Sequence, residues 1–177
     1  MTILRPSTAL AALILITPQI PSAQALTDLS SKDEQITCMA QNIYFEARSD
    51  NYAGQLAVAD VVINRVKDSR YPDTICGVVK DAVLSKWWLE KGKEVPVRDK
   101  CQFSWYCDGK GDETPDRDAW ANALAVSYTM MYGKQGYQGI TEGATHYHAT
   151  YVDPYWASSN QMKLIGNIGD HVFYRWK

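Results

Sequence analysis

Residues 31–48 read SKDEQITCMAQNIYFEAR, and this segment decides the fold class of the chain. Ser31 and Glu34 have the spacing of a capping box, which marks the start of a helix. Apolar side chains then recur at helical spacing, at Ile36, Met39, Ala40, Ile43, Tyr44 and Ala47. The turn-forming residues 49–51 follow directly. The segment therefore predicts a helix from Ser31 to about Ala47 with one buried face.

The rest of the chain combines further helical patterns with short extended segments. Helices are expected at about 52–67, 74–84 and 115–132, and extended segments at 145–150 and 171–175. Residues 85–115 are rich in aromatic side chains and lack a clear period, which is typical of a functional loop. We therefore predict one α+β domain, mainly helical, with a small antiparallel β element.

Composition excludes several classes of protein. The chain has 177 residues, 46% hydrophobic and 21% charged, which is typical of one globular domain. Its formal net charge of -2 argues against nucleic acid as a partner, because binding to phosphates needs a basic surface. No run of 18 apolar residues is present, so no transmembrane helix is expected.

The N-terminal residues have the order of a secretory signal peptide. Arg5 precedes the short apolar block 9–16, and Ala23-Gln24-Ala25 fits a small-x-small cleavage site. We expect residues 1–25 to be removed on export, which leaves 26–177 as a single domain with no stable membrane anchor. The alternative is an N-terminal anchor that is retained.

Export favours disulfides between the four cysteines, of which three pairings are possible. Cys101 and Cys107 flank a short segment that suits a local bridge, and this leaves Cys38 to pair with Cys76. The rival interpretation is a zinc site. It is disfavoured because the chain contains no C-x-x-C spacing.

Glu46 is the first candidate for a catalytic residue. It lies near the end of the first predicted helix, beside the apolar residues Tyr44, Phe45 and Ala47. Such neighbours remove water from a carboxyl group, which raises its pKa and keeps its proton near neutral pH. A protonated carboxyl can donate to a leaving glycosidic oxygen as a general acid. The alternative is a surface glutamate paired with Arg48.

Histidines and exposed aromatic residues are the other candidates. His146 and His148 would share one face of a strand, and together with His171 they could bind zinc. The alternative is that they make hydrogen bonds within an aromatic β element. Trp105 and Trp156 lie in aromatic loops and could stack on sugar rings, although core packing is the other role open to such residues.

Several separated motifs together resemble a known family. In chain order they are IYFEAR (43–48), GQLAVA (54–59), VINRV (62–66), YP (71–72), ICGVV (75–79), QFS (102–104), ATHYHA (144–149), Pro154 with Trp156, IGDH (168–171) and Phe173-Tyr174. Over about Gln35 to Arg175 the chain resembles the spore-cortex-lytic-enzyme type cell-wall hydrolases, with their SleB/CwlJ-like catalytic domain.

This resemblance implies a lysozyme-like helical core and an enzyme that acts on the glycan strands of peptidoglycan, with Glu46 at the catalytic position. Such enzymes are lytic transglycosylases or muramidases. The two cysteine pairs distinguish the chain from the spore enzymes, and we also expect it to have no separate N-terminal wall-binding domain. Both points favour an exported periplasmic enzyme or a phage endolysin.

Glu46 has no obvious second carboxyl residue as a partner in the sequence. This favours a lytic transglycosylase over a muramidase, because ordinary glycosidases use two carboxyl groups. Asp50, Asp60 and Asp153 are the possible second carboxylates. We expect supporting contacts to substrate from six residues, namely Gln102, Ser104, Trp105, Thr145, Tyr147 and Trp156. We expect a monomer without a cofactor. The competing hypotheses are a zinc-dependent wall amidase or peptidase that uses the three histidines, and a non-catalytic sugar-binding module.

Overall fold

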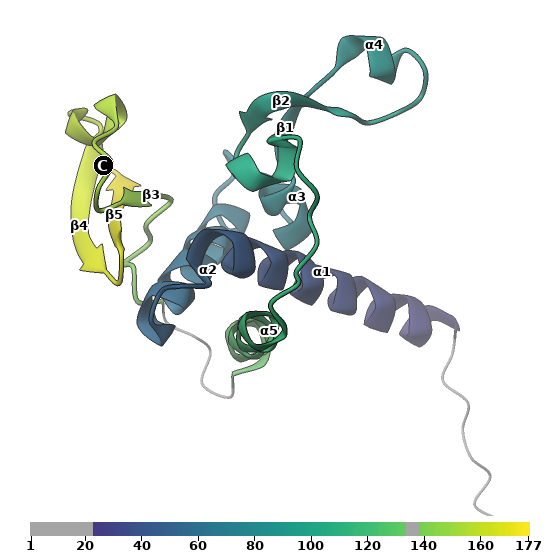
Figure 1. The fold of residues 1–177 in the computed structure, drawn as a ribbon, viewed down its shortest axis with the longest axis horizontal. Coiled ribbons are helices and arrows are strands. Elements are labelled where there is room, and N and C mark those ends of the chain that lie inside the picture. The colour runs from purple at the N-terminus through teal and green to yellow at the C-terminus, as the bar shows by residue number, and fades with distance from the viewer. Residues whose placement is uncertain (1–22, 134–138) are drawn as a thin grey trace, which may run out of the picture.

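The computed structural model of the protein describes residues 23–133 and 139–177 (Figure 1). Most of the predicted signal peptide, residues 1–22, lies outside the described residues. In the described part of the chain, none of the helices combines the length and apolar character needed to cross a bilayer.

Three long helices form the base of the molecule: α1 (Ala23–Ala47), α2 (Tyr52–Val66) and α5 (Arg117–Tyr132). α1 begins at Ala23 rather than at the predicted Ser31, because neither glycine nor proline interrupts the segment between them. It ends at Ala47, as predicted. The core between these helices is filled by fully buried side chains that include Met39, Ile43, Tyr44, Val62 and Val126.

α2 lies at the centre of the fold and is buried on more than one side. Its N-cap is Asn51, whose side chain accepts a hydrogen bond from Gly54 N at 3.0 Å. Ala59 and Val62 join the core with α1, whereas Ala57 and Val61 pack against the C-terminal sheet. A helix between two layers buries most of its surface in this way.

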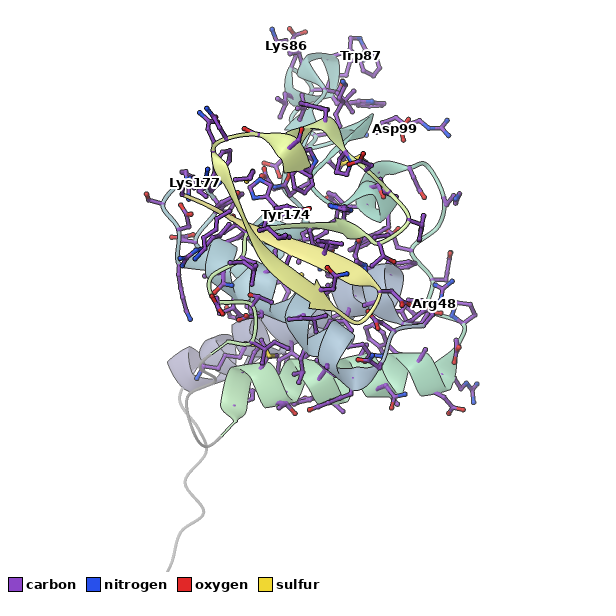
Figure 2. All side chains as sticks on the ribbon, turned by 90° about the vertical axis from the view of Figure 1, so that its left-hand side faces the viewer. Arg48, Lys86, Trp87, Asp99, Tyr174 and Lys177 are labelled. Atoms are coloured by element: carbon purple, nitrogen blue, oxygen red, sulfur yellow. A yellow bond between two sulfur atoms is a disulfide. The ribbon has the colours of Figure 1, made fainter. Side chains whose placement is uncertain are left out.

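The third predicted helix is correct only for its first half. α3 (Ile75–Val79) is capped by Thr74, but residues 82–84 form the strand β1 (Ala82–Leu84). β1 pairs antiparallel with β2 (Pro96–Cys101), and the short helix α4 (Lys86–Leu89) lies between them. These elements project as an arm, with Lys86 and Trp87 at its tip (Figures 1 and 2).

The segment expected to be an irregular loop thus contains regular structure. After β2, the short 3₁₀ helix η1 (Ser104–Cys107) leads through residues 108–116 into α5. Asp116 caps α5, and its side chain accepts a hydrogen bond from Ala119 N at 3.0 Å. The longest stretch of this segment without helix or strand is 108–116.

The C-terminal part is a three-stranded antiparallel sheet in the order β3-β5-β4. β3 (His146–Ala149) and β5 (His171–Trp176) match the predicted extended segments, whereas β4 (Met162–Ile168) was missed. A second short 3₁₀ helix, η2 (Tyr155–Ser158), connects β3 to β4. Phe173 packs with Ala57 and Val61 of α2, which fixes the sheet on the helical base.

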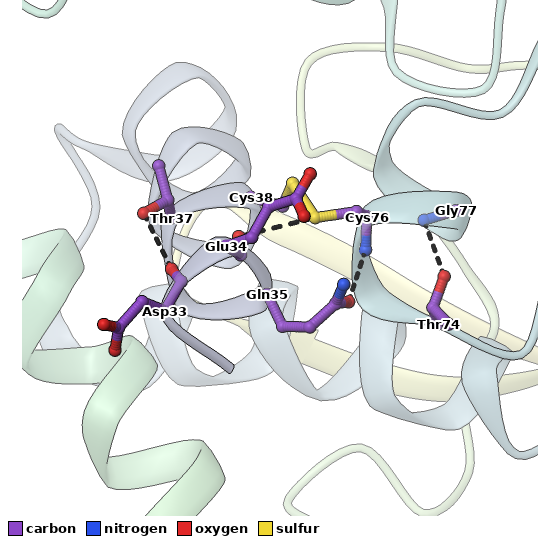
Figure 3. Close-up of a disulfide and its surroundings, with 8 residues drawn as sticks. All are labelled: Asp33, Glu34, Gln35, Thr37, Cys38, Thr74, Cys76 and Gly77. Atoms are coloured by element: carbon purple, nitrogen blue, oxygen red, sulfur yellow. Dashed lines mark hydrogen bonds between the residues drawn. A yellow bond between two sulfur atoms is a disulfide. The ribbon is translucent and has the colours of Figure 1, made fainter. Parts of the chain in front are cut away.

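Both predicted disulfides are present, so the zinc alternative for the cysteines is wrong. Cys38–Cys76 joins α1 to α3, and the side-chain oxygen of Gln35 accepts a hydrogen bond from Cys76 N at 2.9 Å (Figure 3). Cys101–Cys107 joins the end of β2 to the end of η1. The predicted α+β class, mainly helical, is confirmed.

Candidate active site

Glu46 lies in the last turn of α1, where the helix meets the C-terminal sheet. Its carboxylate oxygen Oε2 accepts a hydrogen bond from the hydroxyl of Tyr147 on β3 at 3.0 Å. The side chain is half-buried, so part of it remains accessible from solvent. The structure therefore brings together two of the predicted site residues from opposite ends of the chain.

Arg65 of α2 is a third member of this site, and the sequence analysis did not predict it. Only 6% of the residue is exposed, and its Nε donates a hydrogen bond to the carbonyl oxygen of Thr145 at 2.8 Å. Its guanidinium lies over the ring of Phe103, with 5.1 Å to the centroid. Its charge acts on both Glu46 and Tyr147. The helical spacing could have indicated its burial, because Arg65 lies on the same face of the helix as the buried residues Val58, Val61 and Val62.

The pKa of Glu46 is set by opposing effects. Burial raises it above the usual value, while the Tyr147 hydrogen bond and the positive charge of Arg65 lower it by smaller amounts. Burial and the charge of Glu46 raise the pKa of Tyr147 well above its usual range, so Tyr147 stays a neutral donor. The site can thus keep a proton on Glu46 and stabilise the carboxylate once that proton has left.

Tyr147 is held in position by its neighbours on β5. The ring of His171 meets it edge-on with 5.1 Å between centroids, and Phe173 lies 5.7 Å away. His171 Nδ1 lies 3.2 Å from the buried carboxylate of Asp50. This contact ties the turn that follows Glu46 to the sheet that carries Tyr147.

Of the three candidates for a second catalytic carboxylate, two are engaged in hydrogen bonds and the third is exposed to solvent. Asp50 accepts hydrogen bonds from Asn51 N and Asp170 N in addition to its contact with His171. Asp60 accepts hydrogen bonds from the backbone N–H groups of residues 140 and 141. Asp153 is exposed on the loop after β3. The hydrogen bonds of Asp50 and Asp60 give both carboxylates a structural role, which is to hold loops in place.

The histidines do not converge on one metal site. Paired residues in an antiparallel sheet share a face, and His146 pairs with Tyr174 whereas His171 pairs with Ala149. His146 and His148 therefore lie on the face opposite to His171. Burial, together with the charges of Arg65 and Arg70, lowers the pKa of His146 to about 4. In the described residues, no group of three histidine, cysteine or acidic side chains could hold a metal ion.

The remaining predicted contacts fall in two places. Trp156 packs on His146, His148 and Tyr174, so it lies on the face of the sheet away from Tyr147 and Glu46. Thr145 is buried and supports Arg65 through its backbone oxygen.

Gln102, Ser104 and Trp105 lie at or next to η1, which is separate from the C-terminal sheet. Gln102 and Ser104 are exposed. Trp105 is only 8% exposed, and its Nε1 donates a hydrogen bond to Asn42 at 3.2 Å. It stacks on Phe45 with 4.7 Å between ring centroids, so the main role of the Trp105 side chain is core packing.

Removing the Tyr147 hydroxyl tests the electrostatic balance at this site. In Tyr147→Phe the hydrogen bond that lowers the pKa of Glu46 is lost, so this pKa is expected to rise further. The basic limb of the pH profile of kcat/KM should then move to higher pH, while the maximum rate falls roughly tenfold because the carboxylate loses a donor. Tyr155→Phe is the control, since that residue is 91% exposed. A basic limb that stays in place would contradict this account.

Comparisons with known proteins identify the family of the chain. A family model described as Cell Wall Hydrolase matches residues 49–174. The spore cortex-lytic enzyme of Halalkalibacterium halodurans is 47% identical over 144 residues, which cover 80% of this chain and 34% of that protein. The spore cortex-lytic enzyme of Oceanobacillus iheyensis is 42% identical over 59 residues, 33% of this chain and 21% of that protein. The chain thus spans about a third or less of the length of these curated relatives.

Two solved structures share the fold. The catalytic domain of the Bacillus cereus SleB protein aligns with a TM-score of 0.55 and 25% identity, covering 81% of this chain and 91% of that one. The catalytic domain of the germination-specific lytic transglycosylase SleB from Bacillus anthracis aligns with a TM-score of 0.53 and 25% identity, covering 80% of this chain and 93% of that one. The family match and these relatives show that the chain belongs to the Cell Wall Hydrolase family.

Proposed function

We propose that this protein degrades peptidoglycan by cutting the bond between N-acetylmuramic acid and N-acetylglucosamine, as a lytic transglycosylase with Glu46 as its acid and base. The observation that carries the proposal is the carboxyl of Glu46, which is half-buried, accepts a hydrogen bond from Tyr147 and is influenced by the positive charge of Arg65. Family membership supports a cell-wall substrate, and one solved relative is itself described as a lytic transglycosylase.

The chemistry needs one carboxyl group in two states. Protonated Glu46 gives its proton to the glycosidic oxygen as the bond from that oxygen to muramoyl C1 breaks, which leaves an oxocarbenium-like centre. The Glu46 carboxylate, stabilised by Tyr147 and Arg65, then removes the proton of the muramoyl C6 hydroxyl. The C6 oxygen closes on C1, so the product is a 1,6-anhydro ring and no water is consumed.

The runner-up is a muramidase, which would hydrolyse the same bond. That reaction needs a second carboxylate to activate water or to form a covalent intermediate. Asp50 and Asp60 are less suited to this role because backbone N–H groups already occupy their oxygens. A zinc-dependent amidase loses its support, since the three histidines lie on two faces of the sheet.

The predicted signal peptide indicates the compartment in which we propose that the enzyme acts. Export by the predicted signal peptide would bring the enzyme to the periplasm or the cell wall, where peptidoglycan strands are its partner. The disulfides fit an oxidising compartment. We propose that it works there as a monomer and without a cofactor.

Mass spectrometry of the fragments released from purified peptidoglycan tests this proposal, with Glu46→Gln as control. We expect muramoyl ends that are lighter by one water, and their absence with the variant. Reducing muramoyl ends would overturn the transglycosylase assignment in favour of a muramidase. Intact glycan with cut peptide stems would overturn the glycosidase assignment altogether.

A further inference from the structure

A charged pocket lies within one helical turn of Glu46 and has no role in the chemistry described so far. It has a volume of about 290 Å³ and is lined by Phe45, Arg48, Trp105, Asp108, Lys110, Gly111 and Asp112. Phe45 lies in the last turn of α1 and Arg48 directly follows that helix, while the other residues come from η1 and the loop after it. The stacked rings of Phe45 and Trp105 form its apolar part.

The loop that forms one wall of this pocket is fixed at both ends. The disulfide Cys101–Cys107 anchors its start, and the side chain of Asp108 accepts a hydrogen bond from Lys110 N at 2.8 Å. At its far end, Asp116 N donates a hydrogen bond to the hydroxyl of Tyr44 on α1 at 3.2 Å. The pocket is therefore preformed, which lowers the cost of ordering it around a ligand.

The pocket presents one cation and one carboxylate that lack an ion-pair partner among the described residues. Lys110 pairs with Asp108 at 3.6 Å, whereas neither Arg48 nor Asp112 has an opposite charge within 4.0 Å in that part of the chain. Arg48 is exposed at the surface (Figure 2). Its guanidinium lies over the ring of Tyr44, with 5.1 Å to the centroid. Partial burial and the negative charges of Asp108 and Glu113 raise the pKa of Asp112. This crowding of carboxylates favours a bound ammonium group.

Peptidoglycan offers a matching pair of charges only on its peptide stems. The N-acetylated sugars are neutral, and the lactyl carboxyl of muramic acid is converted to an amide where a stem is attached. The stem itself carries free carboxylates and, where it is not cross-linked, the ammonium group of its diamino acid. A guanidinium binds a carboxylate through two parallel hydrogen bonds, and a carboxylate binds an ammonium group.

From this complementarity we infer that the pocket beside Glu46 binds the uncross-linked peptide stem of the substrate, with Arg48 on a stem carboxylate and Asp112 on the stem ammonium group. The inference rests on the proposed function for its choice of substrate. It makes Arg48 and Asp112 specificity-determining residues, because they select glycan that still carries its stems.

Binding and turnover together test this inference. Soluble disaccharide-tetrapeptide fragments are titrated into the wild-type protein and into Glu46→Gln, Arg48→Gln and Asp112→Asn, with binding followed by NMR shifts. We expect Glu46→Gln to bind like the wild type and each pocket variant to bind roughly tenfold more weakly. KM for stem-bearing glycan should rise by a similar factor in the pocket variants, with kcat little changed.

Two controls separate this role from general charge effects. Arg117→Gln and Asp73→Asn remove exposed charges that do not line the pocket, and they should leave binding unchanged. Glycan stripped of its stems by an amidase keeps a lactyl carboxylate but no ammonium group. Asp112→Asn should therefore not weaken the binding of stripped glycan.

The outcomes distinguish this inference from the proposed function. Equal affinity of the wild type and both pocket variants for stem-bearing fragments would overturn the inference, whatever Glu46 does. Selective loss of binding in the pocket variants would support it, even if Glu46→Gln kept its activity and the proposed mechanism failed. A loss of affinity in Arg48→Gln for stripped glycan alone would also overturn it, because Arg48 would then bind the lactyl carboxylate.

Discussion

Replacing Glu46 with glutamine is expected to lower the rate of glycan cleavage by roughly 10³-fold and to raise the thermal stability of the protein at neutral pH. The rate falls because glutamine has no proton to give to the glycosidic oxygen and cannot take one from the C6 hydroxyl. The amide oxygen can still accept the hydrogen bond of Tyr147, so the surrounding structure should remain in place.

The stability change follows from the direction of the pKa shift. Burial raises the pKa of Glu46 above 4.5, so the folded protein keeps this proton at pH values where the unfolded chain has lost it. The stability associated with this group is present below pH 4.5 and is lost as the pH rises through the higher folded pKa. Glutamine resembles the protonated carboxyl and has no such loss, so the variant should melt at a higher temperature at pH 7–8.

Melting curves of the wild type and the variant between pH 4 and 8 measure this effect. The difference in Tm should be largest at the upper end and should disappear toward pH 4.5, the value from which the pKa is raised. Glu34→Gln is a matched control, since Glu34 is an exposed glutamate on the same helix. Activity that survives in Glu46→Gln would refute the assignment, and a lower Tm at pH 7–8 would refute the account of its burial.

The sequence was sufficient where local rules decide the structure. The apolar spacing in residues 36–47 is a local pattern, so the end of α1 and the depth of Glu46 in the fold followed from it. The disulfides could also be predicted, because a bridge across a short segment leaves one partner for each remaining cysteine. The extended segments at β3 and β5 have the β-branched and aromatic residues that strands favour.

The sequence was less informative about structure that depends on contacts between segments distant in the chain. β4 contains Lys163, Gly166 and Asn167, and it forms a strand because β5 provides a partner. Which face of the sheet His171 occupies depends on its register with β3, which periodicity does not reveal. Trp105 is buried because Asn42 and Phe45 come from another part of the chain to meet it.

Arg65 illustrates the same limit within the candidate site. An arginine on a helix is usually solvent-exposed, and only the packing of α2 between two layers makes this position buried. Its charge then acts on a glutamate on another helix, at the point where β3 provides Tyr147. Glu46 and Tyr147 could be proposed as site residues from the sequence, whereas Arg65, whose charge also lowers the pKa of Glu46, could not.

Loss of the disulfide Cys38–Cys76 is the second large effect that we expect. The bridge closes a segment with a sequence separation of 38, whereas Cys101–Cys107 closes one of 6. Loop entropy of the unfolded chain predicts a loss of about 4 kcal/mol for the double variant Cys38→Ala/Cys76→Ala and about 2 kcal/mol for Cys101→Ala/Cys107→Ala. Cys38 is also 1% exposed within the main core, so its removal leaves a gap among packed side chains.

Unfolding in urea measures the two losses, and enzyme kinetics below the melting temperature separates their roles. The bridge between α1 and α3 lies away from the pocket beside Glu46, so Cys38→Ala/Cys76→Ala should keep its KM while it loses stability. The local bridge anchors the loop of that pocket, so its removal should cost less stability but raise KM for stem-bearing glycan. Equal losses of stability would contradict the loop-entropy argument. An unchanged KM without Cys101–Cys107 would mean that the contact of Asp116 with Tyr44 is sufficient to hold the loop.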